Sequence, residues 1–365
     1  MKHEPHIKFN QMNEIDKPKA VRIGEELNVI ALELFLNNYF GTTTQKLTIE
    51  QFPSGYSNLT YLIRLGVREL VLRRPPFGAE NIAKGHDMAR EFKVLSLIHP
   101  VYPKSPKPLI YSDDTSIIGS DFYVMERVQG VILRASQKID LTPLQMRQLN
   151  ENMIDNLATL HQLDIHKTGL IEIGKPEGYL ERQVNGWAKR YQNAKTEEIP
   201  DMDFAIKWLA ENMPESPAPT FIHNDYKYDN VVLDANDITQ IKAVLDWEMA
   251  TVGDPFTDFG IVLGYMTEKN DPPSLRNFGL KVIEGALSRQ EMVERYEEKV
   301  SRKIHNLVYY YAFALFKLGV VVQQIYYRYH QGFTKDERFA SLIYLTKDCA
   351  LMSARAIKEN RISGF

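Results

Sequence analysis

The stretch FIHNDYKYDNVVLD, residues 221–234, concentrates polar side chains between two apolar runs. Asp225 and Asn230 stand five residues apart, with His223 two positions before the aspartate and Lys227 two positions after it. Phosphoryl transfer needs a carboxylate that accepts a hydroxyl proton, oxygen ligands for Mg²⁺ and a cation on the phosphates. Because this stretch supplies a residue type for each task, its spacing predicts a catalytic loop for phosphoryl transfer.

A second group of polar residues extends this set elsewhere in the chain. Asp246 ends an apolar run twenty-one residues beyond Asp225, where the protein-kinase pattern has a metal ligand. Nearer the N-terminus, a Ser-Gly-Tyr-Ser-Asn turn over 54–58 precedes Arg73 on a predicted strand and Glu91 on a predicted helix. An Asp-rich turn alone is ordinary loop chemistry, but the ordered set predicts a nucleotide-dependent active site.

Four longer motifs resemble those of a known family. They are HNDYKYDN at 223–230, VLDWEMATVGDPFTDFG at 244–260, FPSGYSNLTYLI at 52–63 and LVLRRPP at 70–76. With them the chain resembles, over residues 24–330, the aminoglycoside phosphotransferase-like kinases, which are small-molecule relatives of the protein kinases. The motifs look closer to the phosphotransferase domain fused to some acyl-CoA dehydrogenases than to antibiotic-resistance enzymes. The resemblance implies an α+β, two-lobed protein-kinase-like fold, with a small antiparallel sheet in the N-lobe and a mainly helical C-lobe.

The resemblance also implies roles for the residues of the predicted catalytic loop. Asp225 would be the catalytic base, and Lys227 would contact the transferred phosphate. Asn230 and Asp246 would be the Mg²⁺ ligands. ATP is the expected phosphate donor, with GTP as an open alternative.

Other residues would bind the nucleotide. Arg73 would hold the α- and β-phosphates and pair with Glu91. Backbone groups of Glu126 and Val128 would bind the purine. Backbone N–H groups and hydroxyls of the turn would cover the phosphates, and its residues are Ser54, Gly55, Tyr56, Ser57 and Asn58.

Two residues are expected to support the catalytic loop without touching substrate. By analogy Asp258, in the string GDPFTD, would brace the loop. His223 is expected to support it by hydrogen bonding rather than by acid-base chemistry. His161, at the end of a predicted helix, is given no role.

Three departures from the family pattern affect these expectations. Arg73 replaces the usual lysine, and its planar fork need not lie where an ammonium group would. Strand alternation puts Val71 and Arg73 on one face, which favours Arg73 over Arg74 as the phosphate ligand. The phosphate loop has a single glycine, Gly55, and Asn224 stands where many relatives have glycine. A catalytically silent nucleotide-binding protein therefore remains an alternative.

Hydrophobic periodicity predicts the elements of the N-lobe. Ile23, Leu27, Ile30 and Leu34 recur at helical spacing and predict an amphipathic helix that ends near Gly41. Strands are predicted over 47–52, 59–65, 69–73 and 121–125, and a helix over 86–98 whose inward face carries Met88, Glu91, Phe92, Leu95 and Ile98.

The polar connector at 126–130 sets the expected domain division. We expect a flexible segment over 1–22, an N-lobe over 23–127 and a C-lobe over 128–365. In the C-lobe, Thr142 and Pro143 provide an N-cap and a first-turn proline for a long helix. Short strands are predicted at 221–222, 231–233 and 241–245, followed by helices that are most apolar between 304 and 330.

Composition excludes several classes of partner and site. The net charge of −3 provides no field that would attract nucleic acid or an anionic membrane. Cys349 is the only cysteine, which excludes an internal disulfide and fits a reducing compartment. The polar N-terminus lacks the apolar run that a secretory signal needs, so we do not expect export. Lys317 interrupts the apolar run 307–325, which predicts a buried helix rather than a membrane span. We expect a cytoplasmic protein with a small-molecule partner.

The C-terminal helices favour one kind of acceptor. In the family, helices from this part of the chain wall the acceptor site. Residues 303–334 contain no Asp or Glu, although they include Lys303, Lys317 and Arg328. A polycationic aminoglycoside needs an acidic wall, so an acidic or acyl-bearing alcohol, such as a hydroxyacyl thioester, is expected. Arg328 and Tyr309 are the candidate acceptor contacts, and an aminoglycoside-type antibiotic kinase is the alternative.

Overall fold

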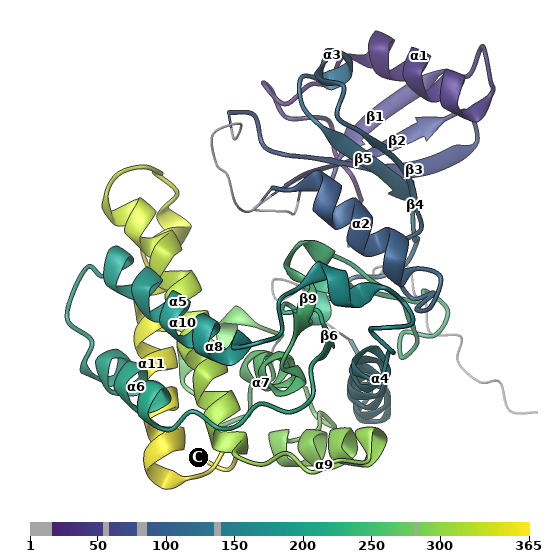
Figure 1. The fold of residues 1–365 in the computed structure, drawn as a ribbon. Coiled ribbons are helices and arrows are strands. Elements are labelled where there is room, and N and C mark those ends of the chain that lie inside the picture. The colour runs from purple at the N-terminus through teal and green to yellow at the C-terminus, as the bar shows by residue number, and fades with distance from the viewer. Residues whose placement is uncertain (1–16, 54–57, 79–85, 135–139, 281–282) are drawn as a thin grey trace, which may run out of the picture. The chain divides into compact units, whose positions relative to one another are not determined.

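The computed structural model describes residues 17–53, 58–78, 86–134, 140–280 and 283–365. The chain divides into two compact units (Figure 1). The first comprises Met1–Ile132 and Val231–Glu248, and the second comprises Leu133–Asn230 and Met249–Phe365. The chain therefore returns once from the second unit to the first. The domain limits expected from the sequence stay a prediction.

The first unit is built on a five-stranded sheet in which every neighbouring pair is antiparallel. In the order β1-β2-β3-β5-β4, the strands run over Leu47–Gln51, Leu59–Leu65, Arg68–Arg74, Phe122–Glu126 and Pro108–Ser112. Arg73 of β3 lies opposite Tyr123 of β5. The small antiparallel sheet expected from the sequence is confirmed, but β4 and the short helix α3, Thr115–Ile118, were not predicted. β4 begins at a proline on the sheet edge, which weakens its strand signal.

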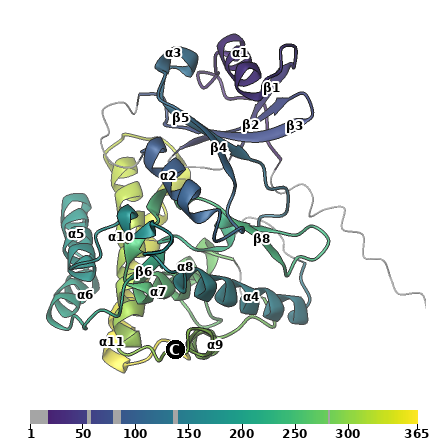
Figure 2. The same ribbon diagram turned by 45° about the vertical axis from the view of Figure 1, so that its right-hand side comes forward.

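Two helices cover the two faces of this sheet (Figure 2). Helix α1, Val29–Phe40, packs on the face that carries Tyr61 and Leu72. Helix α2, Met88–Ile98, lies on the opposite face. Its inward side includes Glu91, which is 1% exposed. The fold thus buries a carboxylate beside the sheet, where it needs a partner.

The apolar stripe predicted for α1 is wrong, although its end at Gly41 is confirmed. The helix begins only after the N-cap Asn28, and Leu32 and Leu36 provide its buried contacts. Three of the four residues expected on the stripe are exposed, namely Ile23 at 99%, Ile30 at 83% and Leu34 at 63%. Because this segment is apolar on more than one side, spacing alone could not select the inward face.

Two short strand pairs flank the catalytic loop in sequence. Strands β7, Val231–Leu233, and β8, Ile241–Val244, form an antiparallel hairpin in the first unit, where β7 also bridges to Val131. Strand β6, Thr220–Ile222, pairs in the second unit with β9, Thr251–Gly253. Strands β6, β7 and β8 are confirmed close to their predicted limits, whereas the three-residue β9 was missed.

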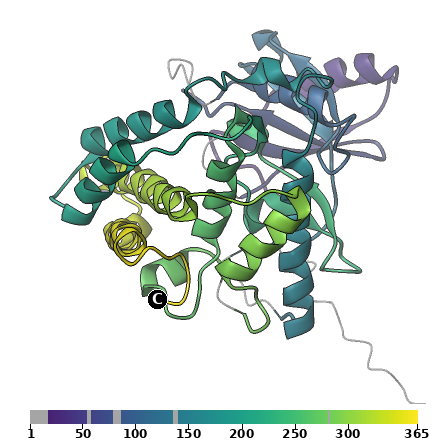
Figure 3. The ribbon, with the colours of Figure 1, turned by 60° about the horizontal axis from the view of Figure 1, so that its bottom comes forward.

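The second unit is mainly helical, as predicted. Its helices α4 to α11 run over Pro143–His161, Tyr179–Ala194, Pro200–Glu211, Pro255–Tyr265, Pro273–Phe278, Arg289–Val300, Leu307–His330 and Leu342–Glu359. Thr142 caps α4 as expected, in a capping box with Gln145. Helix α10 packs against α5, α6, α7 and α11 (Figure 3). Gly260 allows α7 to approach α10 closely, because a Cβ there would lie 2.6 Å from the Tyr310 carbonyl oxygen.

Helix α10 has the length and composition of a membrane span. Among the described residues, it is the one helix that passes this test, and 78% of its most apolar 18-residue window is buried within the protein. Lys317 and Gln323 in its middle are also buried. The helix is thus a core element of the second unit, as the sequence predicted.

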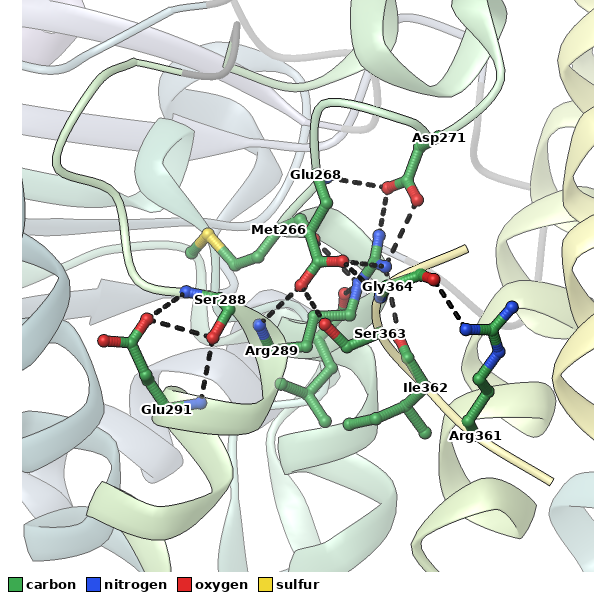
Figure 4. Close-up of polar contacts among 11 residues, drawn as sticks. Met266, Glu268, Asp271, Ser288, Arg289, Glu291, Arg361, Ile362, Ser363 and Gly364 are labelled. Carbon is green, nitrogen blue, oxygen red and sulfur yellow. Dashed lines mark hydrogen bonds and ion pairs between the residues drawn. The ribbon is translucent and has the colours of Figure 1, made fainter.

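A buried arginine holds the last residues of the chain in the second unit (Figure 4). Arg289 is 1% exposed and forms ion pairs with Asp271 and Glu268. It also donates to the carbonyl oxygen of Ile362 at 3.2 Å, while Glu268 accepts from the Ser363 hydroxyl at 2.6 Å. This network attaches the segment after α11 to the loop between α7 and α8.

Candidate active site

Arg73 is the centre of a buried ionic cluster in the first unit. Its Nε lies 3.4 Å from Glu91 Oε2, so the expected ion pair is present. One of its terminal nitrogens lies 3.1 Å from Asp246 Oδ1 and 3.3 Å from Glu248 Oε2. Arg73 is only 8% exposed. Burial acts to lower its pKa, but the surrounding carboxylates, Glu91 above all, hold that pKa well above its ordinary value. Arg73 is therefore a permanent cation.

The neighbouring Arg74 has a different environment. Its guanidinium donates to the carbonyl oxygens of Pro75 and Ile118 and lies 3.8 Å from the centroid of the Phe77 ring. Strand alternation thus separates the two arginines, and Arg73 is the one that meets Glu91.

The ionic cluster fits a nucleotide with a divalent cation. Arg73 contacts three carboxylates, more than one guanidinium can neutralise. Arg73 Nε and Glu91 Oε2 are buried without a hydrogen-bond partner among the described residues. Asp246 and Glu248 offer the hard oxygen donors that Mg²⁺ prefers, and Mg²⁺ commonly takes few protein ligands together with phosphate and water. No group of three or more His, Cys, Asp or Glu residues suited to a metal occurs in the described part of the chain.

The backbone at Asp246 has a left-handed conformation with φ of 65°. Such a conformation is uncommon outside glycine, and it persists where the surroundings impose it, often at functional sites. Glu248 accepts from Asn58 Nδ2 at 2.8 Å, and Asn58 Oδ1 lies 2.8 Å from His86 Nδ1. Sequence analysis missed Glu248, although its two-residue spacing from Asp246 in the string LDWE was an available signal.

The remaining residues proposed for the nucleotide are only partly described. Ser54, Gly55, Tyr56 and Ser57 lie outside the described residues. Glu126 is the last residue of β5, and its backbone N–H donates to the Lys107 carbonyl at 2.9 Å. Val128 follows the strand and packs against a small apolar cluster of the β7–β8 hairpin. Contacts of these two residues with a purine stay a prediction.

Asp225 is the centre of a hydrogen-bonded group in the second unit. Lys227 Nζ lies 2.9 Å from Asp225 Oδ2 and 3.1 Å from Oδ1. Asn230 Nδ2 donates to Asp225 Oδ2 and to its backbone oxygen, both at 2.9 Å. This orientation leaves Asn230 Oδ1 as the atom suited to a metal. Three of the predicted residues are therefore in direct contact.

Tyr265 is a further contact of Asp225 that sequence analysis missed. Its hydroxyl donates to Asp225 Oδ1 at 2.9 Å. Burial, and then the charge of Asp225, raises the pKa of Tyr265 well above its ordinary value, so the hydroxyl stays a donor. Tyr265 lies seven residues after Asp258 on α7, a spacing that places both side chains on one helix face and could have been noticed.

Asp258 braces the catalytic loop. It is fully buried and accepts from the backbone N–H groups of His223 and Asn224, both at 2.7 Å. His161 Nε2 lies 3.1 Å from the same carboxylate, and its Nδ1 lies 2.6 Å from the Tyr296 hydroxyl. Burial acts to raise the pKa of Asp258, but the hydrogen bond and charge of His161 hold it below its ordinary value. His161, which was given no role, thus supports the brace.

The loop residues beside Asp225 have supporting contacts. His223 Nδ1 accepts from the Asp225 backbone N–H at 3.3 Å, in line with the expected hydrogen-bonding role. Asn224 has φ of 67°, a conformation in which glycine is favoured and asparagine is tolerated. Its side-chain oxygen accepts from the Tyr179 hydroxyl at 3.0 Å, and its amide nitrogen donates to the Met249 carbonyl at 3.1 Å. Asparagine can therefore replace the glycine of many relatives.

Other contacts are described for the two candidate acceptor residues, Tyr309 and Arg328. The Tyr309 hydroxyl donates to the Leu209 carbonyl at 2.9 Å, and its ring packs against Trp208. Arg328 is an exposed residue near the end of α10. Neither belongs to the described residues that line the pocket next to Asn224. Their contact with an acceptor stays a prediction.

Both units match a protein-kinase-like phosphotransferase fold, with a small antiparallel sheet in one and a braced catalytic loop among helices in the other. The chain belongs to the phosphotransferase enzyme family, whose model matches residues 48–284.

Curated relatives agree with this assignment. The chain is 35% identical over 320 residues to acyl-CoA dehydrogenase family member 11 of Rattus norvegicus, a match that covers 86% of this chain and 41% of the rat protein. It is 34% identical over 303 residues to member 10 of Mus musculus, covering 82% of this chain and 28% of the mouse protein. The chain thus spans less than half the length of these relatives.

Solved structures are similar as well. A candidate aminoglycoside phosphotransferase from Ralstonia eutropha superposes with a TM-score of 0.78 at 27% identity, covering 92% of this chain and 99% of that one. A choline kinase from Cryptosporidium parvum gives a TM-score of 0.60 at 13% identity, covering 87% of this chain and 91% of that one. An aminoglycoside phosphotransferase in complex with GDP and kanamycin gives 0.61 at 12% identity, covering 88% and 99%. The last two support the fold alone.

Proposed function

We propose that this phosphotransferase moves the γ-phosphate of ATP to a hydroxyl group of a small metabolite, with Asp225 as the catalytic base. The observation that carries the proposal is the Asp225 carboxylate, which Lys227, Asn230 and Tyr265 hold in one orientation. Such a carboxylate accepts the proton of the attacking hydroxyl. The fixed loop keeps it aligned, since Asp258 accepts from two consecutive backbone N–H groups.

In this proposal, residues of both units serve the nucleotide. Asp246 and Asn230 would hold Mg²⁺, which would neutralise phosphate charge, and Glu248 would support the ligand set of the first unit. Arg73 binds the α- and β-phosphates while Glu91 fixes its direction, and Lys227 contacts the transferred phosphate. GTP is the alternative donor, because some similar solved structures contain GDP.

The proposed acceptor is an acidic or acyl-bearing alcohol, such as a hydroxyacyl thioester. Two observations favour it over an aminoglycoside. The names of the curated relatives refer to acyl-CoA chemistry. Residues 303–334 lack Asp and Glu, which a polycationic drug would require. We also propose that the protein works in the cytoplasm, without nucleic acid or membrane partners.

A nucleoside-diphosphate release screen tests this function. Purified protein with Mg²⁺ and ATP, or GTP, would be offered hydroxyacyl-CoAs, hydroxy acids, sugars and aminoglycosides. We expect acceptor-dependent release with a hydroxyacyl or hydroxy acid compound, abolished when Mg²⁺ is removed. Phosphorylation of kanamycin-like compounds alone would reverse the choice of acceptor. ATP binding without turnover of any acceptor would favour the catalytically silent nucleotide-binding protein. The arginine at position 73, where the family pattern has lysine, motivates that alternative.

A further inference from the structure

A pocket of about 300 Å³ lies in the second unit next to the catalytic loop. Its wall includes Asn224, the chain neighbour of Asp225. Ten of the described residues line the pocket; none of these is Asp or Glu, and four are cations, namely Lys175, Arg182, Arg190 and Lys317. The whole chain carries a net charge of −3, so this local excess of positive charge does not follow from composition.

The exposed cations of this wall make contacts that carry no opposite charge, as far as the described residues show. Arg182 donates to the backbone carbonyls of Lys175 and Glu177, which neutralise no charge. The Arg190 guanidinium lies 4.4 Å from the centroid of the Trp187 ring. Within the described ranges, the contacts of these cations are with backbone carbonyls and the Trp187 ring. Solvated surface cations are common, but here they converge on a concave site.

Lys317 distinguishes this pocket from an ordinary basic surface. It is 7% exposed, and its Nζ lies 3.2 Å from the carbonyl oxygen of Asn224. Nζ also lies 5.6 Å from the centroid of the Trp187 ring. Burial lowers the pKa of Lys317 to about 8. The charges of Asp225 and Asp258 offset part of this burial, while its direct hydrogen-bond acceptor, the Asn224 carbonyl, is only a neutral dipole. A buried ammonium group is costly unless an anion meets it directly.

We propose that this pocket binds an anionic group of the acceptor, a carboxylate or a phosphate, while the acceptor hydroxyl lies at Asp225. Lys317 and Arg190 provide the charge, and Trp187 provides an apolar wall for the carbon chain between the two groups. The inference rests on the proposed function and narrows its acceptor to alcohols that carry negative charge. A free hydroxy acid meets this requirement through its carboxylate, and a hydroxyacyl-CoA meets it through its phosphates.

Binding at the pocket can be measured without knowing the natural acceptor. Trp187 lines the pocket, and the chain contains only two other tryptophans, Trp208 and Trp247. The indole N–H resonance of Trp187, assigned with Trp187→Phe, would be followed by NMR with saturating Mg²⁺ and a non-hydrolysable ATP analogue. The probes are inorganic phosphate, 3-hydroxybutyrate and the neutral 3-hydroxybutyramide. We expect saturable shifts of the Trp187 resonance with both anions. The anion with the lower Kd shows whether the pocket binds a phosphate or a carboxylate of the acceptor.

Matched variants test the residues. Arg190→Met and Lys317→Met should each raise the Kd of the anions by about tenfold or more. Arg190 is exposed, so its variant should fold even if the buried Lys317 variant does not. Lys189→Met removes a cation from the same helix outside the pocket and should leave the Kd unchanged. Equal shifts with the neutral amide, no shift with either anion, or an unchanged Kd in Arg190→Met would overturn the inference.

Failure of this inference is distinguishable from failure of the proposed function. One outcome is turnover that depends on Asp225, with the same acceptor KM in Arg190→Met as in the wild type. This outcome would support the kinase function and exclude the anion site. Charge-dependent binding at Trp187 without turnover of any acceptor would leave the anion site and exclude the kinase.

Discussion

At the scale of residues, three donors orient one carboxylate. Lys227 and Asn230 come from the catalytic loop itself, whereas Tyr265 comes from the end of α7. The lysine balances the charge of Asp225, and the two neutral donors fix the carboxylate plane. Each donor should therefore contribute to the rate more than to stability.

Tyr265→Phe tests this division. The variant keeps the ring and removes the hydroxyl that donates to Asp225, so kcat should fall by about tenfold while the acceptor KM changes little. Tyr329→Phe is the matched control, because it removes a hydroxyl that donates a hydrogen bond to the exposed Glu337. Steady-state kinetics of both variants and the wild type would check the prediction. A kcat of Tyr265→Phe equal to that of the wild type would contradict it.

Arg73→Lys tests the nucleotide role of the ionic cluster. Lysine keeps the charge but cannot bridge Glu91, Asp246 and Glu248 as the guanidinium fork does. We expect the Kd for Mg²⁺-ATP to rise by about tenfold. Arg74→Lys should lower the thermal midpoint through its lost bond to the Ile118 carbonyl, with unchanged nucleotide affinity. Calorimetric titration of both variants with Mg²⁺-ATP checks this prediction. Weaker binding in Arg74→Lys and unchanged binding in Arg73→Lys would assign the phosphates to Arg74.

At the scale of elements, helices fix the loop that carries Asp225. Asp258 on α7 accepts from the loop backbone, His161 at the end of α4 supports Asp258, and Lys317 on α10 donates to the Asn224 carbonyl. These contacts join segments far apart in sequence. They let the loop keep the left-handed conformation at Asn224.

The effect of Lys317→Met on the free energy of unfolding, measured at two pH values, tests the burial of Lys317. Burial lowers its pKa from 10.5 to about 8, although Asp225 acts in the opposite direction. Between these values the unfolded chain binds more protons than the folded chain, so the contribution of Lys317 to the free energy of unfolding rises with pH. Any stability gain of Lys317→Met over wild type should therefore shrink by about 1–2 kcal/mol between pH 7.5 and 9.5. Urea unfolding at both pH values, with Lys189→Met as the control, checks this; a constant difference would contradict it.

The sequence predicted elements well where the signal was local. Strand β2 has the predicted limits, and the cap of α4 and the stop of α1 were found from single residues. The inward face of α1 was wrong because packing, not spacing, selected Leu32 and Leu36. The contact of His161 with Asp258 was missed because long-range packing creates it, and neither propensity nor local pattern contains that information. Glu248 and Tyr265 did leave a signal in their spacing from Asp246 and Asp258, but the spacing does not identify their partners Asn58 and Asp225.

At the scale of the molecule, the residues with proposed functional roles are divided between two units. Arg73, Asp246 and Glu248 belong to the first, and Asp225 and Asn230 belong to the second. The proposed function requires a contribution to one nucleotide from each set. Membership of the phosphotransferase family is consistent with this requirement, while the longer relatives combine the same region with other sequence.

The buried network of Arg289 should matter for stability but not for chemistry. Asp271→Asn leaves the guanidinium with a weaker partner and should lower the free energy of unfolding by about 3 kcal/mol. Arg361→Met removes an exposed arginine of the same segment and should change the free energy of unfolding little. Denaturant unfolding of both variants checks this, and an unchanged midpoint for Asp271→Asn would show that the network contributes little.

Asp225→Asn provides the most direct measurement of the proposed function. The amide keeps the size of the side chain but cannot accept the hydroxyl proton, so kcat for acceptor phosphorylation should fall by about 10²–10⁴. The Kd for Mg²⁺-ATP, measured on the same preparation, should stay within a few-fold of wild type. A variant that transfers phosphate at the wild-type rate would contradict the assignment of Asp225 as the base.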